Sequence, residues 1–205
     1  DWIAINGVKL KKAAELLGLA NIIIFSPEDL SIIKNGPSDR RRFIDAELCQ
    51  LDKVYLYNLT NYNKIVNQRN NLLKDILIHP ELRDTLDVWD SQLINIGSKI
   101  IERRKIFIDQ LNEIIVYIHK NISGNKEKLD IIYAPNIDID GYEEKLKRHR
   151  EKDIRYKLTS VGPHRDDFII NINDVDTKKY GSQGQQRTAA LSLKLAEIKL
   201  VEKIT

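Results

Sequence analysis

The stretch "DTLDVWDSQLINIGSKIIERRKIFIDQLNEIIVYIHKN", Asp84 to Asn121, sets the architecture of this 205-residue chain. Its apolar residues recur three or four positions apart, which is the spacing of one face of an α-helix. The members of this stripe are Leu86, Trp89, Leu93, Ile96, Ile100, Phe107, Leu111, Ile114 and Ile118. The stretch therefore predicts one long amphipathic helix that buries the stripe.

A second helical stretch precedes it, from an expected N-cap at Ser38 to about Ile78, where His79-Pro80 ends it. Its apolar steps alternate between four and three, as in a heptad seam. The seam consists of Ile44, Leu48, Leu51, Tyr55, Tyr62, Ile65, Leu72 and Ile76, with Asn58 and Arg69 at two of its positions. Two long helices with a short, proline-containing connection predict an antiparallel helical hairpin.

Shorter elements flank the hairpin on both sides. Before it we expect a β-hairpin at Asn6-Gly7, helical turns in "KLKKAAELLG", a buried strand at Ile22 to Phe25, and a helix start capped by Ser26. After it we expect a strand that runs into a loop over Leu129 to Ile139, a charged helix after Gly141, a hairpin at Asp166 to Asp176, and a last helix from Gln185 or Gln186. The predicted class is α/β, predominantly helical, with short strands.

Composition limits the possible functions only broadly. The 33 basic and 30 acidic residues give a formal net charge of +3, which is too balanced to indicate a nucleic-acid binder. The longest apolar run is far shorter than a membrane span, so we expect no membrane partner. The single cysteine, Cys49, cannot form an internal disulfide, and we interpret it as a small core residue.

The stretch "YGSQGQQRTAALSLKLAEIKL", Tyr180 to Leu200, places polar residues and two glycines directly before a helix. A helix N-terminus has free N–H groups and partial positive charge, and a glycine lets an anion approach closely. The candidate phosphate-binding residues are Ser182, Gln183, Gly184, Gln185, Gln186 and Arg187. The alternative is a well-capped helix in which Ser182 bonds only to the next turn.

This stretch resembles the signature motif of ABC-type ATPases, whose common form is Ser-Gly-Gly-Gln. Ser182, Gly184 and Gln185 match it, and Gln183 replaces the first glycine. With that replacement and the following "TAALSLKLAE", the chain resembles the RecF family. "FSPEDL", "GPSDRRRFID" and "SVGPHRDDF" also resemble RecF segments, in the same order. The resemblance covers nearly the whole chain.

The resemblance implies a long helical lid or arm (residues 36–158) attached to part of an ABC-type, SMC-like ATPase lobe (residues 1–35 and 159–205). It also implies that Ser182, Gly184 and Gln185 cover ATP held by a partner protomer, in an ATP-dependent homodimer. The chain contains no G-x-x-x-x-G-K-[ST] motif and no Walker B strand after the signature helix. We therefore expect the middle of a RecF-like protein, without catalytic residues or a bound cofactor of its own.

For the whole protein, the resemblance implies ATP and Mg²⁺ as cofactors and weak DNA-dependent ATPase activity. It implies single-stranded or gapped duplex DNA, RecR and RecO as partners. The implied processes are DNA repair, recombination, replication and the SOS response in the bacterial cytoplasm. The competing hypothesis is a helical-hairpin scaffold or partner-binding module without a nucleotide role.

Two further sets of residues leave alternatives open. His164, Arg165, Asp166 and Asp167 could support the ATP site as a general base and as metal or phosphate ligands. We favour instead a turn in which Arg165 pairs with a carboxylate. The possible DNA contacts are Arg40, Arg41, Arg42, Lys145, Lys147, Arg148, Arg150, Lys152, Arg155 and Lys157, with Arg103, Arg104 and Lys105 as a third basic cluster. Interleaved acidic residues also allow a plain solvated face.

Overall fold

A computed structural model describes residues 4–5, 8–9 and 22–204. Its α-helices are α1 (Leu30–Lys34), α2 (Pro37–Leu51), α3 (Lys53–Asp75), α4 (Leu86–Ile122), α5 (Tyr142–Tyr156), α6 (Thr177–Tyr180) and α7 (Gln183–Ile204). Its strands are β1 (Ala4–Ile5), β2 (Val8–Lys9), β3 (Leu129–Ala134), β4 (Asp167–Ile172) and β5 (Val175–Asp176). The predominantly helical class with short strands is confirmed. The helical turns expected in "KLKKAAELLG" lie outside the described residues.

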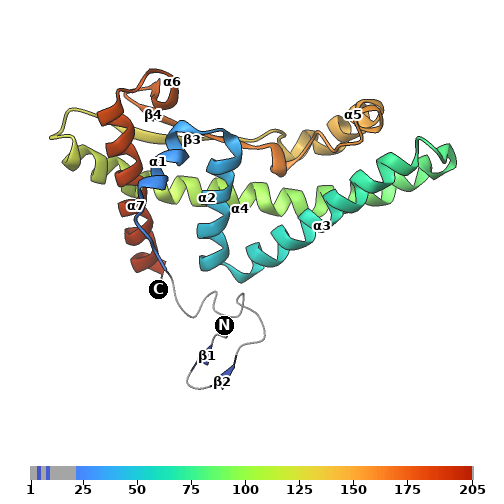
Figure 1. Ribbon diagram of the computed structural model, residues 1–205, viewed down its shortest axis with the longest axis horizontal. Coiled ribbons are helices and arrows are strands. Elements are labelled where there is room, and N and C mark those ends of the chain that lie inside the picture. The colour runs from blue at the N-terminus through green and yellow to red at the C-terminus, as the bar shows by residue number, and fades with distance from the viewer. Residues whose placement is uncertain (1–3, 6–7, 10–21, 205) are drawn as a thin grey trace.

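Helix α4 is the axis of the molecule (Figure 1). Its first half pairs antiparallel with α3 to form a projecting arm, and its second half packs against β3 and α7. The predicted hairpin is therefore present. Leu86, Leu93, Ile100, Phe107 and Leu111 of the predicted stripe are buried, whereas Trp89, Ile96, Ile114 and Ile118 are half-buried. The last turns bury Ile115 and His119 instead. The buried face thus includes three polar side chains, Asp90, Arg104 and His119, that the periodicity did not predict.

The single helix expected from Ser38 to Ile78 is wrong, because the chain breaks at Asp52. This residue has extended backbone angles (φ −141°, ψ 103°), and it ends α2 and caps α3. Its carboxylate accepts the N–H groups of Val54 and Tyr55 at 2.9 and 3.0 Å. Aspartate prefers such N-cap positions over helix interiors, since its side chain competes for backbone N–H groups. The break turns α2 away from the arm (Figure 1).

The three-stranded sheet has the order β3-β4-β5 and is antiparallel throughout. Ile131 on β3 lies opposite Ile170 on β4. The turn between β4 and β5 has positive φ at Asn173 (51°) and Asp174 (63°), which is the geometry of a type I′ hairpin turn. The predicted strand, hairpin and charged helix α5 are all present, and β1 pairs antiparallel with β2 as expected. The sheet joins residues on both sides of position 158, the expected domain boundary.

Two local predictions in the first part of the chain need correction. Residues Ile22 to Phe25 form no strand, and Ile22, Ile24 and Phe25 are 59%, 66% and 50% exposed. A strand requires a hydrogen-bonded neighbour, and the described part of the chain places none beside this segment. Helix α2 begins at Pro37 after Gly36, not at a Ser38 cap. Ser26 does cap the 3-10 helix Pro27–Asp29, and its own N–H donates in return to the Asp29 carboxylate at 2.9 Å.

Candidate functional site

The start of α7 is a capping box built by Ser182 and Gln185. The backbone N–H of Gln185 donates to Ser182 Oγ at 3.2 Å, and the Ser182 N–H donates to Gln185 Oε1 at 2.9 Å. This reciprocal pair fixes the first turn of the helix. The helix therefore begins at Gln183, two or three residues earlier than the sequence suggested. Gln186 is buried and donates to the carbonyl of Thr177 at 3.2 Å, so it holds α7 against α6.

The capping box leaves part of the helix N-terminus open. Within the described residues, the backbone N–H groups of Gln183 and Gly184 have no acceptor. A Cβ placed on Gly184 would meet only Ser182 Oγ, at 3.8 Å, so packing among the described residues does not require glycine there. Ser182, Gln183, Gly184 and Arg187 are all exposed. The arrangement leaves two backbone N–H groups open at the positive end of the helix, a geometry that a phosphate group would fit.

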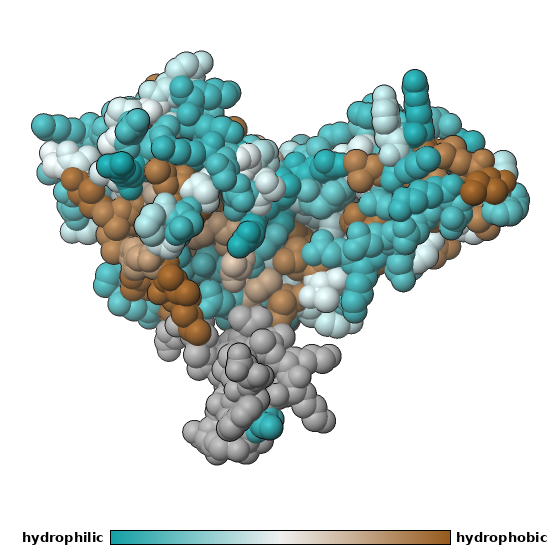
Figure 2. All heavy atoms as spheres, viewed as in Figure 1, coloured by the Kyte–Doolittle hydropathy of each residue, from teal (hydrophilic) through white to brown (hydrophobic). Residues whose placement is uncertain are grey.

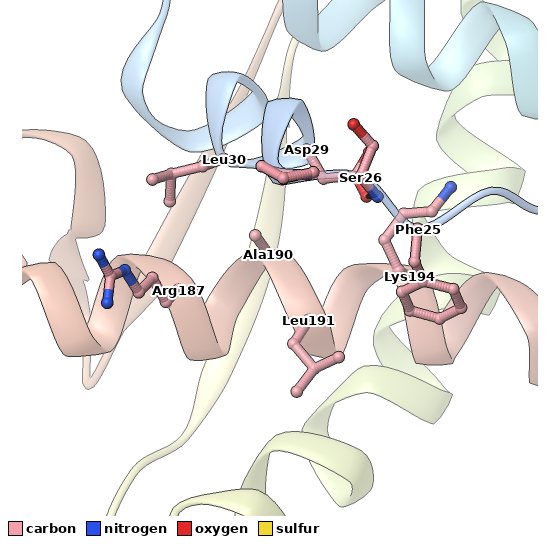
Figure 3. A pocket seen from close by; sticks show the side chains of 9 residues that line it. Phe25, Ser26, Asp29, Leu30, Arg187, Ala190, Leu191 and Lys194 are labelled. Atoms are coloured by element: carbon pink, nitrogen blue, oxygen red, sulfur yellow. Dashed lines mark hydrogen bonds between the residues drawn. The ribbon is translucent and has the colours of Figure 1, made fainter.

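A groove of about 570 Å³ runs along the outer side of α7, opposite residues 25–30. Figure 3 shows Arg187 near one end of it and Phe25 with Lys194 near the other. Phe25 and Leu191 leave 50% and 42% of their surface exposed, and apolar side chains gather on this part of the surface (Figure 2). Arg187 has no ion-pair partner in the described chain. Its guanidinium is therefore available close to the open helix start.

The "GPHRDD" stretch does not form a free catalytic cluster. His164 lies between two partners: Nε2 bonds to the carbonyl of Thr159 at 2.9 Å and Nδ1 to the hydroxyl of Tyr62 at 2.9 Å. A carbonyl only accepts, so Nε2 carries the proton and Nδ1 accepts. Burial lowers the pKa of His164 to about 4, with Arg165 and Arg41 adding to the effect. Both nitrogens are occupied, so this imidazole is not a free general base.

The two aspartates of this stretch are paired with arginines from distant helices. Arg104 donates to Asp166 at 2.9 Å, and Tyr133 donates to the same carboxylate at 2.5 Å. Arg40 binds Asp167 with two bonds, at 2.8 and 3.0 Å. The expected pair between Arg165 and a carboxylate is therefore not formed. Arg165 is exposed and has no ion pair among the described residues, and the two aspartates pair with Arg104 and Arg40 instead. Neither carboxylate offers a free ligand to a metal.

Gly162 is required by the packing around this stretch. Its φ is +131°, and an added Cβ would lie 2.2 Å from the hydroxyl of Tyr62 and 2.4 Å from that of Tyr142. Its N–H donates to Asn136 Oδ1 at 3.0 Å. A side chain would both strain the backbone and displace two buried tyrosines. The stretch is therefore a tight structural junction between the arm and the sheet.

Some cations of the basic clusters are already bound to carboxylates or carbonyls, and others are exposed and unpaired among the described residues. Arg40 is 7% exposed and bound to Asp167, and Arg41 donates to the carbonyl of Asp166, whereas Arg42 is exposed. In the third cluster, Arg103 pairs with Asp52, and Arg104 is 1% exposed. Arg40 and Arg104 therefore serve the interior rather than the surface.

Helix α5 shows the same division. Lys145 donates to the carbonyl of Asn136, and Lys147, Arg148 and Arg150 pair with carboxylates. Lys152, Arg155 and Lys157 are exposed and have no ion pair in the described chain. The last three side chains are consequently the free cations of this helix.

The described residues contain no group of three or more His, Cys, Asp or Glu side chains that could hold a metal ion. None of the helices in that part of the chain has the length and hydrophobicity needed to cross a bilayer. Cys49 packs against the core, and burial raises the pKa of its thiol to about 12. This cysteine therefore lacks the thiolate character of a nucleophile.

Comparison with known proteins identifies the family, although no protein-family model matches the chain. The DNA replication and repair protein RecF of Lachnospira eligens is 59% identical over 202 residues, which cover 98% of this chain and 56% of that protein. The RecF protein of Lachnoclostridium phytofermentans is also 59% identical, over 203 residues. The chain belongs to the RecF family. It spans little more than half the length of these curated relatives.

Solved RecF structures have the same fold as this RecF chain. The structure of the recombination mediator protein RecF with ATPrS has a TM-score of 0.91 at 41% identity, over 100% of this chain and 57% of that one. The RecF–ATP structure has a TM-score of 0.90 at 39% identity. At this level of similarity, the helical arm and the small sheet follow the RecF architecture.

The sequence did not predict the two arginines that organise this RecF chain. Arg69 is fully buried and donates to Asp90 and Asp153 at 2.8 Å each. Arg104 is bound by Asp45 and Asp166. Arg69 fills a position of the predicted seam where an apolar residue is expected. Arg104 lies between Ile100 and Phe107, where the apolar stripe of α4 has a gap. That interruption is the signal that could have identified them as buried.

Proposed function

We propose that this chain is the signature-bearing part of a RecF-type, ATP-dependent DNA-binding protein of recombinational repair. The observation that carries the proposal is the open start of α7, where Gln183 and Gly184 have free N–H groups beside the exposed Arg187. This set of donors suits the terminal phosphate of ATP. The similar proteins are a DNA replication and repair protein and a RecF–ATP structure, which supports the same proposal.

The phosphate would come from ATP held by a second protomer. In the ABC-type arrangement that the signature motif implies, one protomer holds ATP and the helix start of the other covers the terminal phosphate. A helix start that binds phosphate only when a partner presents it makes association depend on ATP. ATP supplies the phosphates that join two protomers, and its hydrolysis with Mg²⁺ removes that link.

The proposed division into units follows from this role. Residues 1–35 and 159–205 would belong to an ATPase lobe, and residues 36–158 to a helical lid domain that includes the projecting arm. For the whole protein we propose weak DNA-dependent ATPase activity, gapped or single-stranded DNA as substrate, and RecR and RecO as partners in the SOS response of the bacterial cytoplasm. A scaffold without a nucleotide role explains neither the open N–H groups of Gln183 and Gly184 nor the glycine at position 184.

The test uses a full-length protein that carries this segment. Ser182→Arg removes the capping oxygen and places a long side chain in front of the free N–H groups. We expect at least about tenfold weaker ATP-dependent self-association, since hydrogen bonds to a charged group contribute about 1.5–3 kcal/mol. Sedimentation velocity with and without ATP measures the association, and nucleotide binding to the monomer is expected to persist.

Two variants serve as controls for this experiment. Ser91→Arg places the same side chain at an exposed position on α4 and should leave association unchanged. Gly184→Ala keeps the capping box and should not lower stability, since the new methyl group meets open space. It should still weaken association by covering the N–H groups. Normal ATP-dependent association of the Ser182 variant contradicts the proposed role.

A further inference from the structure

A chain of hydrogen bonds runs from Gln185 into the buried contact between α4 and α7. Gln185 Nε2 donates to Glu127 Oε1 at 2.8 Å, and Glu127 Oε2 lies 3.2 Å from His119 Nε2. His119 Nδ1 lies 2.9 Å from Ser192 Oγ, which donates to the carbonyl of Thr188 at 2.7 Å. The chain therefore begins in the first turn of α7 and returns to the same helix two turns later.

The residues of this hydrogen-bond chain come from three parts of the fold. His119 lies in the last turn of α4, and Glu127 lies in the connection to β3, where its N–H donates to Ser123 Oγ at 3.2 Å. His119 and Ser192 are fully buried. Apolar side chains would pack between these helices without the desolvation cost of polar ones. The polar chain is thus better explained by the group at its end, the amide of Gln185.

Donors and acceptors fix the orientation of that amide. Ser192 has one hydroxyl hydrogen, and it goes to Thr188, so His119 Nδ1 donates to Ser192. A carboxylate only accepts, so Glu127 receives a bond from the Gln185 amide, and it also receives one from His119 Nε2 when the imidazole carries both of its protons. This leaves Gln185 Oε1 to accept the N–H of Ser182, which is half of the capping box. Rotation of the Gln185 amide would break bonds at both of its ends.

We infer that Glu127 and His119 are positioning residues for the signature site. They hold the Gln185 amide in its capping orientation, and the capping box in turn directs the free N–H groups of Gln183 and Gly184 outward. The site is thereby linked to the end of α4, the helix that forms the arm. The inference rests on the proposed function, and it assigns a role to two residues outside the signature motif.

The test compares two substitutions of Glu127 in the full-length protein. Glu127→Ala removes the acceptor and should weaken ATP-dependent self-association about tenfold, as expected when a hydrogen bond to a charged group is removed. Glu127→Gln should restore it, because an amide oxygen still accepts from Gln185 and its NH₂ can donate to a neutral His119. Glu113→Ala is the matched control, since Glu113 forms only an exposed pair with Lys203.

A double-mutant cycle separates positioning from general stability. If Glu127 acts through Gln185, Glu127→Ala should have no further effect in a Gln185→Ala background. Additive losses, or normal association of Glu127→Ala, overturn the inference. Unfolding by urea, measured for every variant, shows whether association falls more than stability does.

A second measurement keeps this inference separate from the proposed function. The side-chain NH₂ signals of Gln185, measured by NMR in the same protein without nucleotide, should shift in Glu127→Ala and not in Glu113→Ala. If Ser182→Arg still associates normally with ATP, the proposed function fails, and the Gln185 signals alone decide whether Glu127 holds this amide. Unchanged signals in Glu127→Ala overturn the positioning role.

Discussion

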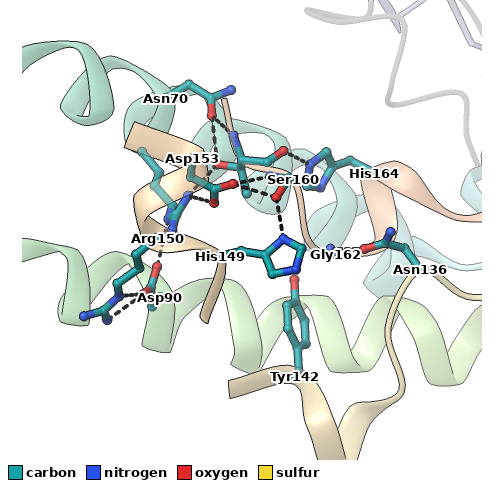
Figure 4. A network of polar contacts seen from close by, with 12 residues as sticks. Asn70, Asp90, Asn136, Tyr142, His149, Arg150, Asp153, Ser160, Gly162 and His164 are labelled. Carbon is teal, nitrogen blue, oxygen red and sulfur yellow. Dashed lines mark hydrogen bonds and ion pairs between the residues drawn. The ribbon is translucent and has the colours of Figure 1, made fainter. Parts of the chain in front are cut away.

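Individual buried arginines hold this chain together where its elements cross. Arg104 binds Asp45 from α2, Asp166 from the "GPHRDD" stretch and the carbonyl of Pro163. Arg69 binds Asp90 and Asp153, and Figure 4 shows these carboxylates also held by Arg150 and Ser160. Arg69 and Arg104 each meet two carboxylates, which offsets the desolvation cost of burying their charge. These arginines stabilise the fold, although arginine is also the residue type expected at a DNA-binding surface.

His164 is a second residue whose burial has a measurable consequence. Its pKa falls from 6.5 to about 4 because it is buried. Between these values the unfolded chain binds the proton and the folded chain does not, so this histidine lowers stability as the pH falls from about 6.5 toward 4. We expect a loss of about 2 kcal/mol between pH 7 and pH 5, relative to His164→Gln.

Urea unfolding of both proteins at several pH values measures this difference. Comparing the two proteins is necessary because Glu47 acts in the opposite direction. Burial raises the pKa of Glu47 to about 9, so its contribution to stability decreases as the pH rises between 4.5 and 9. Glu47 is present in both proteins, and its effect cancels in the comparison. Parallel pH profiles would show that His164 titrates normally in the folded protein.

At the scale of the helices, the break at Asp52 makes α2 and α3 run in different directions. Without it, α2 would continue along the arm instead of turning toward α7 and β4. Asp52 stabilises the break in two ways: its carboxylate caps α3, and it pairs with Arg103 of α4 at 2.8 Å. The capping bonds and Arg103 hold the pKa of Asp52 below its usual value, although partial burial opposes them.

Asp52→Ala should lower the free energy of unfolding by about 1–2 kcal/mol, because the variant lacks both the N-cap of α3 and a salt bridge. Chemical denaturation measured at pH 7 tests this expectation. Asp75→Ala is the matched control, since this exposed aspartate ends α3 and its side chain makes no bond in the described chain. If both substitutions cost equally little, the cap does not stabilise the break.

For the molecule as a whole, the exposed cations without an ion pair are the candidate contacts for the DNA proposed above. The charged helix α5 lies beside the arm (Figure 1), and its free cations are Lys152, Arg155 and Lys157. Exposed cations without partners can neutralise phosphates and release counterions. Cations already paired with carboxylates contribute less. We therefore propose the C-terminal half of α5 as the DNA-contacting part of this helix.

Replacement of Lys152, Arg155 and Lys157 by glutamine should reduce the salt dependence of DNA binding. The slope of log K against log salt should become shallower by about 2–3, at about 0.7–0.9 for each phosphate that is no longer neutralised. Fluorescence anisotropy with a gapped duplex at several salt concentrations measures it. The control replaces Lys147 and Arg148, which pair with Glu143 and Glu144, and should change the slope less. An unchanged slope in the triple variant removes these residues from the DNA surface.

Local sequence pattern is sufficient to specify several parts of this protein. Apolar spacing predicts the α3–α4 hairpin, alternation predicts the β4–β5 hairpin, and the polar stretch before α7 predicts an open helix start. Each of these features depends on residues only a few positions apart. For the same reason, the motifs of the RecF resemblance were visible without coordinates.

Which polar side chains are interior, and what they hold, became known only from the folded chain. The sequence places Arg104 in a basic cluster and Arg165 beside two aspartates, yet Arg104 binds Asp166 across 62 positions and Arg165 stays exposed. The same is true of Glu127, which reaches Gln185 across 58 positions. Ion pairs and hydrogen bonds between distant segments depend on how the helices cross, and no local pattern records that. The physical reason is that burial, which makes these pairs strong, exists only after the chain has folded.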